Sequence, residues 1–444
     1  MKVKVKQGTE EINSIGGISL IGGLLNSLKN LGTVDNMQMV NVKTGKIKHS
    51  GILKSIVGLF ALGKTDYADI EPFRNDAFFC DSLALNGVPS ESTLRQRCDE
   101  LGQADGISKT VLSSNIELLK KVSDFGAEKT GYAEYVPFDA DVSPQDNSGS
   151  HKEGVSWTYK GHEGYAPMLA YLGTSGYMLN CEQRPGSQHS NNGALEFFEE
   201  CFDAIDELGI ANTITRLDSA HDDAEVIKLH QKRNKYFIIK RNLRKEIPEQ
   251  WLALASRVGE CKNPRKGKKV FTGIASHIKP ASREDLKPIF VVFEVIKRTI
   301  DKNGQELLIP NLEVNTWWTN LPEDANEIIR LYHNHGTSEQ FHSELKSDIG
   351  LERMPSGKFA TNSLLLSLGM LAFNILRIIG QAGLVMKKSL PRKFNIQRRR
   401  LRSVMQDLVY IACKRVRHAG SIFLKLGRNC PWFEVFRQLH IKFC

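Results

Sequence analysis

Acidic residues at three separated places in the chain are of the type that binds divalent metal ions. Asp139 and Asp141 lie in the run FDADVS, Asp218 ends the run NTITRLD, and Glu339 occurs much later in a polar stretch. Carboxylate oxygens are the ligands that Mg²⁺ and Mn²⁺ prefer, and two such ions about 4 Å apart can serve both sides of an in-line phosphoryl displacement. If the fold gathers these acids, the chemistry they indicate is two-metal phosphoryl transfer.

The elements around the aspartates indicate that these residues meet at one edge of a sheet. Alternating side chains place Asp139 and Asp141 on one face of a strand, and Asp218 ends another strand, where α/β sheets usually have their sites. Taken singly, each acid is more often a turn cap or a solvated side chain, so the prediction depends on the combination. The order of elements predicts a mixed α/β layer with an antiparallel start: strands 135–143, 165–173 and 176–185, helix 191–209, strand 212–218, helix 222–233 and strand 236–241.

The third acid, Glu339, lies in the stretch LYHNHGTSEQFHSELKSD at 331–348. Gly336 interrupts the helical pattern, and Thr337 with Gln340 has the Thr-x-x-Gln form of a capping box. We therefore expect Glu339 in the first turn of a new helix. The helix dipole keeps a carboxylate ionised at that position, which suits a metal ligand.

Before the first aspartate, residues 1–130 are predicted to be mostly helical. Within them, NGVPSESTLRQRCDEL contains Ser90 as a plausible N-cap of a short polar helix. That helix fits the reading element of a helix-turn-helix and, equally well, a surface helix of an ordinary bundle. After residue 244, the segment 245–320 is predicted to be a β-rich insertion, and helical character returns at 321–384.

Charge and composition favour a nucleic-acid partner. The chain has a formal net charge of +10, and 387–402 contains eight Lys or Arg in sixteen residues, among them Arg398, Arg399 and Arg400. Together with the run NPRKGKK at 263–269, this predicts a phosphate-binding surface, although a charge run is usually only a solvated face. The eight cysteines form no C-x-x-C pair, which fits a reducing cytoplasm. The apolar run 364–376 is about 13 residues and is predicted to be a buried core helix.

The late acidic stretch resembles a known signature. Tyr332, His335, Glu339 and Lys346 match the Y-x2-R-x3-E-x6-K spacing of DDE transposases of bacterial insertion sequences, with His335 in the place of the arginine. FDADVS, the sequence following it and RLDSAHDD resemble the insertion-sequence thirteen-eighty group. The similarity covers at least residues 130–410.

The resemblance implies an RNase H-like catalytic core with a β-rich insertion, plus a helical N-terminal region and a basic C-terminal region. The implied divisions are an N-terminal DNA-binding region at 1–130, the first part of the core at 131–244, the insertion at 245–320, the second part of the core at 321–384 and the basic region at 385–444. The implied ligands of two Mg²⁺ or Mn²⁺ ions are Asp141, with Asp139 as the alternative, Asp218 and Glu339.

The same resemblance assigns DNA contacts. Tyr332, His335 and Lys346 would contact the DNA backbone near the cut, and histidine in place of arginine would make end binding weaker or pH-dependent. In related transposases a tryptophan of the insertion stacks on a flipped base. Trp318, or its neighbour Trp317, would take that role here, with core packing as the favoured alternative.

The implied function is that of a DNA transposase that cleaves the ends of its own insertion sequence and joins them to target DNA. Its partners would be terminal inverted repeats and target DNA, bound by a homodimer, without a membrane and in the nucleoid of a bacterial cytoplasm. Two other classes remain open. One is a nuclease of the same fold without strand transfer, and the other is a catalytically inactive DNA-binding derivative.

Overall fold

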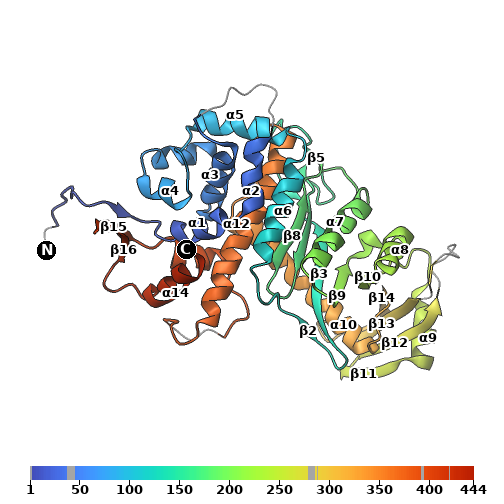
Figure 1. Cartoon of the computed structure of the whole chain (residues 1–444). Helices are drawn as coiled ribbons and strands as arrows, with labels where there is room; N and C mark the ends of the chain where they lie inside the picture. The colour runs from blue at the N-terminus through green and yellow to red at the C-terminus, as the bar shows by residue number, and fades with distance from the viewer. Residues whose placement is uncertain (1–2, 38–45, 279–285, 288, 392–394, 420) are drawn as a thin grey trace.

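A large mixed sheet forms one half of the molecule (Figure 1). The computed structural model describes residues 3–37, 46–278, 286–287, 289–391, 395–419 and 421–444, and within them this sheet has ten strands. β3, β9 and β10 are parallel to one another, and their neighbours in the sheet are antiparallel. The order is β8 (Tyr177–Glu182), β7 (Met168–Leu172), β3 (Glu134–Val142), β9 (Thr213–Leu217), β10 (Tyr236–Lys240), β14 (Glu306–Thr319), β13 (Ile289–Ile300), β12 (Lys268–Ile278) and β11 (Glu260–Arg265), with β2 (Glu128–Lys129) beside β3.

The central strands are buried on both faces, which explains their continuous apolar runs. One face packs against α7 (Ala194–Glu207) and α8 (Ala224–Lys232), where Phe138 meets the rings of Phe198 and Phe202. The opposite face carries Ile214 and Ile238 and is covered by α10 (Ala325–His333). These observations confirm the predicted mixed α/β order of strands and helices between residues 134 and 240.

The β-rich segment after β10 extends the same sheet. It begins with α9 (Pro248–Val258) and ends with β14, which returns to pair with β10 in an antiparallel register, Ile239 opposite Trp318. The chain then enters α10, so the insertion separates the second aspartate from Glu339 along the sequence without separating them in space. A further small sheet, β4 (Gln145–Asp146), β6 (Glu163–Tyr165) and β5 (Ser156–Trp157), lies between β3 and β7 in the sequence.

The two ends of the chain lie together in a second, mostly helical half (Figure 1). β1 (Ile12–Asn13) pairs with β15 (Cys413–His418), which pairs with β16 (Ser421–Leu426). Gly23 of α1 lies so close to α14 that an added Cβ would be 2.4 Å from the carbonyl oxygen of Phe443. The remaining elements here are α1 (Ile18–Asn26), α2 (Lys29–Gly32), η1 (Thr33–Asn36), α3 (His49–Ala61), η2 (Tyr67–Phe73), α4 (Ala77–Ser82), α5 (Glu91–Gly102), α6 (Ile107–Leu119), α13 (Leu401–Val404), the π-helical η6 (Met405–Val409) and α14 (Phe433–Phe443).

The polar helix predicted after Ser90 is α5, and the Ser90 hydroxyl accepts the Thr93 amide hydrogen at 3.3 Å as the expected N-cap. One of its arginines, Arg97, is buried and lies 2.6 Å from the ring of His49 on α3. Arg95 pairs with Glu91 on the same helix. The inward position of Arg97 favours the interpretation of α5 as a packing helix of a bundle.

A single long helix, α12 (Phe359–Val385), joins the two halves. It is 27 residues long, twice the length of the apolar run that predicts it, and is long and apolar enough to cross a membrane. However, 94% of its most apolar window is buried inside the protein, as expected for a core helix. Asn374 anchors α12 to the edge strand β8: its amide nitrogen donates to the Met178 carbonyl and to Asn115, each at 2.7 Å, and its oxygen accepts the Met178 amide hydrogen at 2.9 Å.

We predict that Asn374→Leu lowers the free energy of unfolding by about 3 kcal/mol, because it removes the partner of the Met178 amide hydrogen and of the Asn115 side-chain oxygen, both buried. Urea denaturation followed by circular dichroism would measure this change. The exposed Asn303→Ala is the matched control and should leave the midpoint unchanged. Equal midpoints for both variants would contradict the anchoring role.

Candidate active site

Asp141 and Asp218 lie at the carboxyl ends of two adjacent parallel strands. The β3–β9 register places Asp139 opposite Arg216, and its continuation brings Asp141 opposite Asp218. Because side chains alternate, both aspartates point to the face of the sheet that α10 covers. One oxygen of Asp218 accepts the Ala220 amide hydrogen at 3.0 Å, so this residue also caps the short η3 (Ser219–His221).

Glu339 approaches from the helices that follow α10. It lies in α11 (Ser338–Ser343), between the 3₁₀ turn η4 (Asn334–Thr337) and the π-helical η5 (Glu344–Asp348). A cleft of ≈ 270 Å³ is lined by Glu339 and Asp141 together with Tyr159, Lys160, His342 and Lys346. The sequence-predicted acids from β3 and α11 therefore share one cleft, with Asp218 on the neighbouring strand.

Electrostatics links the three acids. Burial raises the pKa of Asp141 to about 6, and the negative charges of Asp218 and Glu339 contribute to the rise. The pKa of the Tyr159 hydroxyl is raised by burial and by the same three carboxylates. Within the described residues, no three His, Cys, Asp or Glu side chains are gathered closely enough to hold an ion as they stand. The acids are thus an electrostatically coupled group with excess negative charge.

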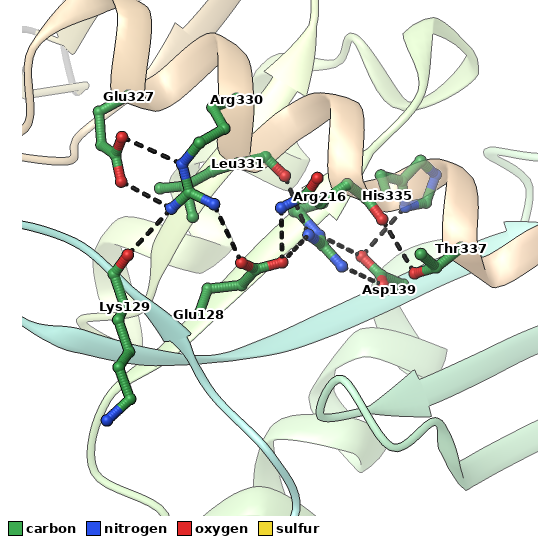
Figure 2. A network of polar contacts seen from close by, with 10 residues as sticks. Glu128, Lys129, Asp139, Arg216, Glu327, Arg330, Leu331, His335 and Thr337 are labelled. Carbon is green, nitrogen blue, oxygen red and sulfur yellow. Dashed lines mark hydrogen bonds and ion pairs between the residues drawn. The ribbon is translucent and has the colours of Figure 1, made fainter. Parts of the chain in front are cut away.

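Asp139, the alternative first ligand, is occupied by other partners (Figure 2). It is 2% exposed, and its two oxygens accept hydrogen bonds of 2.6 Å each from Nε and Nη2 of Arg216. Burial alone would raise the pKa of Asp139, but the charges of Arg216 and His335 outweigh it and lower the pKa to about 2. This arrangement favours Asp141 over Asp139 as the available carboxylate.

The Asp139–Arg216 pair belongs to a network that joins β2, β3 and β9 to α10 (Figure 2). Arg216 also donates to the Leu331 carbonyl at 2.9 Å and lies 3.5 Å from Glu128. Glu128 in turn accepts hydrogen bonds from Asn334 at 2.9 Å and Arg330 at 3.3 Å. The network holds the end of α10, and hence the start of the segment that carries Glu339, against the strands that carry the aspartates. An arginine inside the apolar strand TITRLD is the sequence signal that indicates this buried partner.

His335, predicted to contact DNA, points inward in this structure. Its Nδ1 lies 3.0 Å from Asp139 Oδ1, and its side chain is 13% exposed. Burial tends to lower the pKa of His335, but the negative charge of the adjacent Asp139 has the larger, opposite effect. The pKa of His335 therefore lies above its usual value. Arg216 and His335 are therefore the two basic side chains that contact Asp139.

The expected capping box at Thr337 is wrong. Thr337 has helical backbone angles and makes no cap to the following amides, and its hydroxyl donates to the Asn334 carbonyl at 2.9 Å. The physical reason is that the backbone remains helical from α10 through η4 into α11, so the amides at the start of α11 already have carbonyl partners. Glu339 therefore does not lie at a free helix N-terminus.

The other predicted DNA contacts differ in accessibility. Lys346 lines the cleft, donates to the Pro144 carbonyl and lies 3.8 Å from Glu352. Tyr332 is half-buried, with its ring centroid 6.0 Å from that of His335. Trp318 is 5% exposed, and its indole nitrogen donates to Asp222 at 2.8 Å. Trp318 and its neighbour Trp317 belong to separate clusters on opposite faces of the sheet, so core packing describes both in this structure.

The arginine run 398–400 folds onto the helix that follows Glu339. Arg398 donates to Glu344 at 2.5 Å and to Gln340 at 2.7 Å, and Arg400 pairs with Asp348 at 2.9 Å. Arg399 is buried, pairs with Asp407 and stacks on Trp432. Arg398 and Arg400 also line a second hollow of ≈ 350 Å³ next to Glu339. Arg392 and Lys393 of the basic run lie outside the described residues.

We predict that, without metal, the free energy of unfolding falls by roughly 2 kcal/mol as the pH rises from about 4 to 6. The reason is that Asp141 keeps its proton up to a pKa of about 6 in the native state, against 3.8 as its ordinary value. Urea titrations at several pH values would measure the fall. Asp141→Asn should remove it, and Mg²⁺ should restore stability at pH 7 in the wild type only. The same slope in both proteins would contradict the electrostatic coupling.

We predict that Glu344→Gln destabilises the fold by about 3–5 kcal/mol, because it leaves the buried Arg377 guanidinium, now 2.7 Å from Glu344, without its counter-charge. Thermal and urea unfolding would measure the loss. The control is Glu434→Gln, which breaks the exposed pair with Arg437 and should give no measurable change. If Glu344→Gln is as stable as the control, the Glu344–Arg377 pair does not hold η5 against α12.

Among solved structures, the chain is similar to the piggyBac transposase in a synaptic complex with hairpin DNA determined by cryo-EM, at 10% identity and a TM-score of 0.46, covering 88% of this chain and 79% of that one. No curated protein matches the chain. The family model described as "Transposase DDE domain group 1" matches residues 1–443. With its whole length matched in this way, the chain belongs to the DDE transposases.

Proposed function

We propose that this transposase cleaves the ends of its own insertion sequence and joins them to target DNA by metal-dependent phosphoryl transfer. The observation that carries the proposal is the placement of three carboxylates: Asp141 and Asp218 are at the ends of adjacent strands, and Glu339 is in the same cleft as Asp141. The sheet order β8-β7-β3-β9-β10, with the last three strands parallel, supports an RNase H-like core. We also propose membership of the insertion-sequence thirteen-eighty group, on the motifs around these acids.

The donor set fits divalent ions. All three side chains are carboxylates, and burial, together with the negative charges of Asp218 and Glu339, raises the pKa of Asp141. Mg²⁺ or Mn²⁺ would relieve the repulsion among these charges, and Asp141, Asp218 and Glu339 are the residues that would hold two such ions. When bound, these ions would supply activation of the attacking oxygen and stabilisation of the leaving oxygen.

The chain's own residues position the phosphate and the acids. Lys346 and Lys160 line the cleft next to Asp141 and provide positive charge for a phosphate oxygen. Burial lowers the pKa of Lys346, with the repulsion of Lys160 contributing, so an arriving phosphate would also relieve strain between two cations. The Arg216–Asp139–His335 network would keep Glu339 in reach of the strand aspartates by fixing the end of α10.

The proposed partners are the terminal inverted repeats and target DNA, bound by a homodimer in the nucleoid of a bacterial cytoplasm. The net charge of +10 supports binding to a polyanion. A nuclease of the same fold would carry the same acids, so strand transfer has to be measured separately. An inactive derivative is less well supported, since acids are present at all three positions.

We predict that Glu339→Gln reduces Mg²⁺-dependent cleavage of end DNA at least about 1,000-fold, because it removes one of the charged ligands. Radiolabelled DNA from the ends of the element, resolved on denaturing gels, would measure cleavage. The control is Glu306→Gln, an exposed acid at the start of β14, which should retain activity within a few-fold.

Pre-cleaved ends with a free 3′-hydroxyl would then be incubated with plasmid DNA to measure joining. Joined product from the wild type and none from Glu339→Gln is the expected result. Cleavage without joining would instead support the nuclease, and equal cleavage by both proteins would refute the assignment of Glu339.

A further inference from the structure

An aromatic turn stands at the rim of the active-site cleft. β5 and β6 are joined by residues 158–162, closed by a hydrogen bond of 2.9 Å from the Thr158 amide to the His162 carbonyl. Two large aromatic residues lie at this turn, Trp157 at the end of β5 and Tyr159 within the turn, and each is 65% exposed. Such exposure is unusual in this chain for tryptophan, since the other four are 1 to 9% exposed.

The turn is joined directly to the catalytic strand. The Tyr159 hydroxyl donates to the Val142 carbonyl at 3.0 Å, one residue beyond Asp141. Tyr159 and the adjacent Lys160 both line the cleft that contains Asp141 and Glu339. The Lys160 ammonium lies 5.8 Å from the centre of the Tyr159 ring. An aromatic face, a cation and two of the three acids therefore line one cleft.

The small sheet that presents these rings is fixed to its surroundings. The Asp146 amide donates to Glu352 at 2.8 Å, and the Gln145 side chain donates to the Leu351 carbonyl at 2.7 Å. On the other side, the Ser187 amide donates to the Ser156 hydroxyl at 2.8 Å. Rings presented by an anchored sheet lose little conformational freedom when they bind a ligand, which favours a recognition role.

We propose that the β5–β6 turn is a stacking platform for unpaired nucleobases of the DNA strand whose scissile phosphate enters the cleft. Aromatic side chains combined with a positive charge are the usual means of holding single-stranded nucleic acid, because every base has a π-face and every nucleotide a phosphate. A base inside a duplex has both faces covered, so stacking on Trp157 or Tyr159 selects DNA that is unpaired at the cut. Lys160 binds the phosphate next to the stacked base.

This platform rests on the proposed function, because it assumes that DNA is the substrate of the cleft. Trp157→Ala and Tyr159→Ala should each lower the cleavage rate of fully paired end DNA about tenfold. Tyr132→Ala is the matched control. Tyr132 is also an exposed aromatic residue, at 76%, but it precedes the first residue of β3, whereas Asp141 lies near the last residue of that strand. The control should cleave as the wild type does.

An abasic series separates stacking from a general loss of activity. A single abasic nucleotide is placed in turn at each position near the scissile phosphate. With the abasic nucleotide at one of these positions, the wild type should cleave as slowly as Trp157→Ala cleaves intact DNA. The same abasic substrate should not slow Trp157→Ala any further, because that variant already lacks the stacking partner. Additive losses at every position would overturn the platform.

Binding gives a readout that does not depend on catalysis. Trp157 is the one strongly exposed tryptophan among five, so quenching of protein fluorescence by a mixed-sequence single-stranded oligonucleotide in Ca²⁺ reports on it. We expect the single strand to quench the fluorescence more strongly than its duplex does. In Trp157→Phe the quenching by the single strand should be lost. Equal quenching by both forms, or the same quenching in Trp157→Phe, would overturn the platform. If the wild type and Glu339→Gln prove equally inactive, the proposed function fails, while the quenching still decides the platform.

Discussion

The buried pairing of Arg216 with Asp139 is the interaction on which the geometry of the candidate active site depends. An isolated charge in the centre of a sheet is strongly unfavourable, so each of these residues requires the other, and both require good hydrogen-bond geometry. The guanidinium uses its remaining nitrogen to bind the Leu331 carbonyl at the end of α10. The ion pair between two strands thereby also fixes the helix that leads to Glu339 (Figure 2).

Two aspartates on one strand face consequently have opposite environments. Asp139 lies deeper, where two cations lower its pKa, and Asp141 lies at the strand end, where burial and two other acids raise its pKa. The first is a structural anion, and the second is a carboxylate with unneutralised charge in a cleft. The environment also decides the role of the arginine run 398–400. Its three arginines form ion pairs with Glu344, Asp407 and Asp348. Arg399 is buried, whereas about half of the Arg400 side chain stays exposed although it is paired with Asp348.

Much of the core was predictable because local patterns express it directly. The alternation in FDADVS, the apolar run before Asp218 and the helical spacing in 191–209 each follow from side-chain burial on a known period. The structure has β3, β9 and α7 at these places. The capping box at Thr337 failed because a local motif competes with the continuation of the preceding helix, and the sequence holds no information on which one wins. α12 continues past the apolar run 364–376 because the charged Arg377 has a buried partner, Glu344.

The sequence by itself determined the types and spacing of the acids, the family signature around Glu339, the order of strands and helices and the excess of positive charge. Only the tertiary structure decided which acid is paired with an arginine. Arg216 pairs with Asp139, whereas Asp141 lies beside Asp218. It also decided that the insertion continues the central sheet, that the two chain ends pack together and that Trp318 is buried while Trp157 is exposed. The physical reason is that burial and ion pairing join residues distant in the chain, whereas sequence patterns report only on near neighbours.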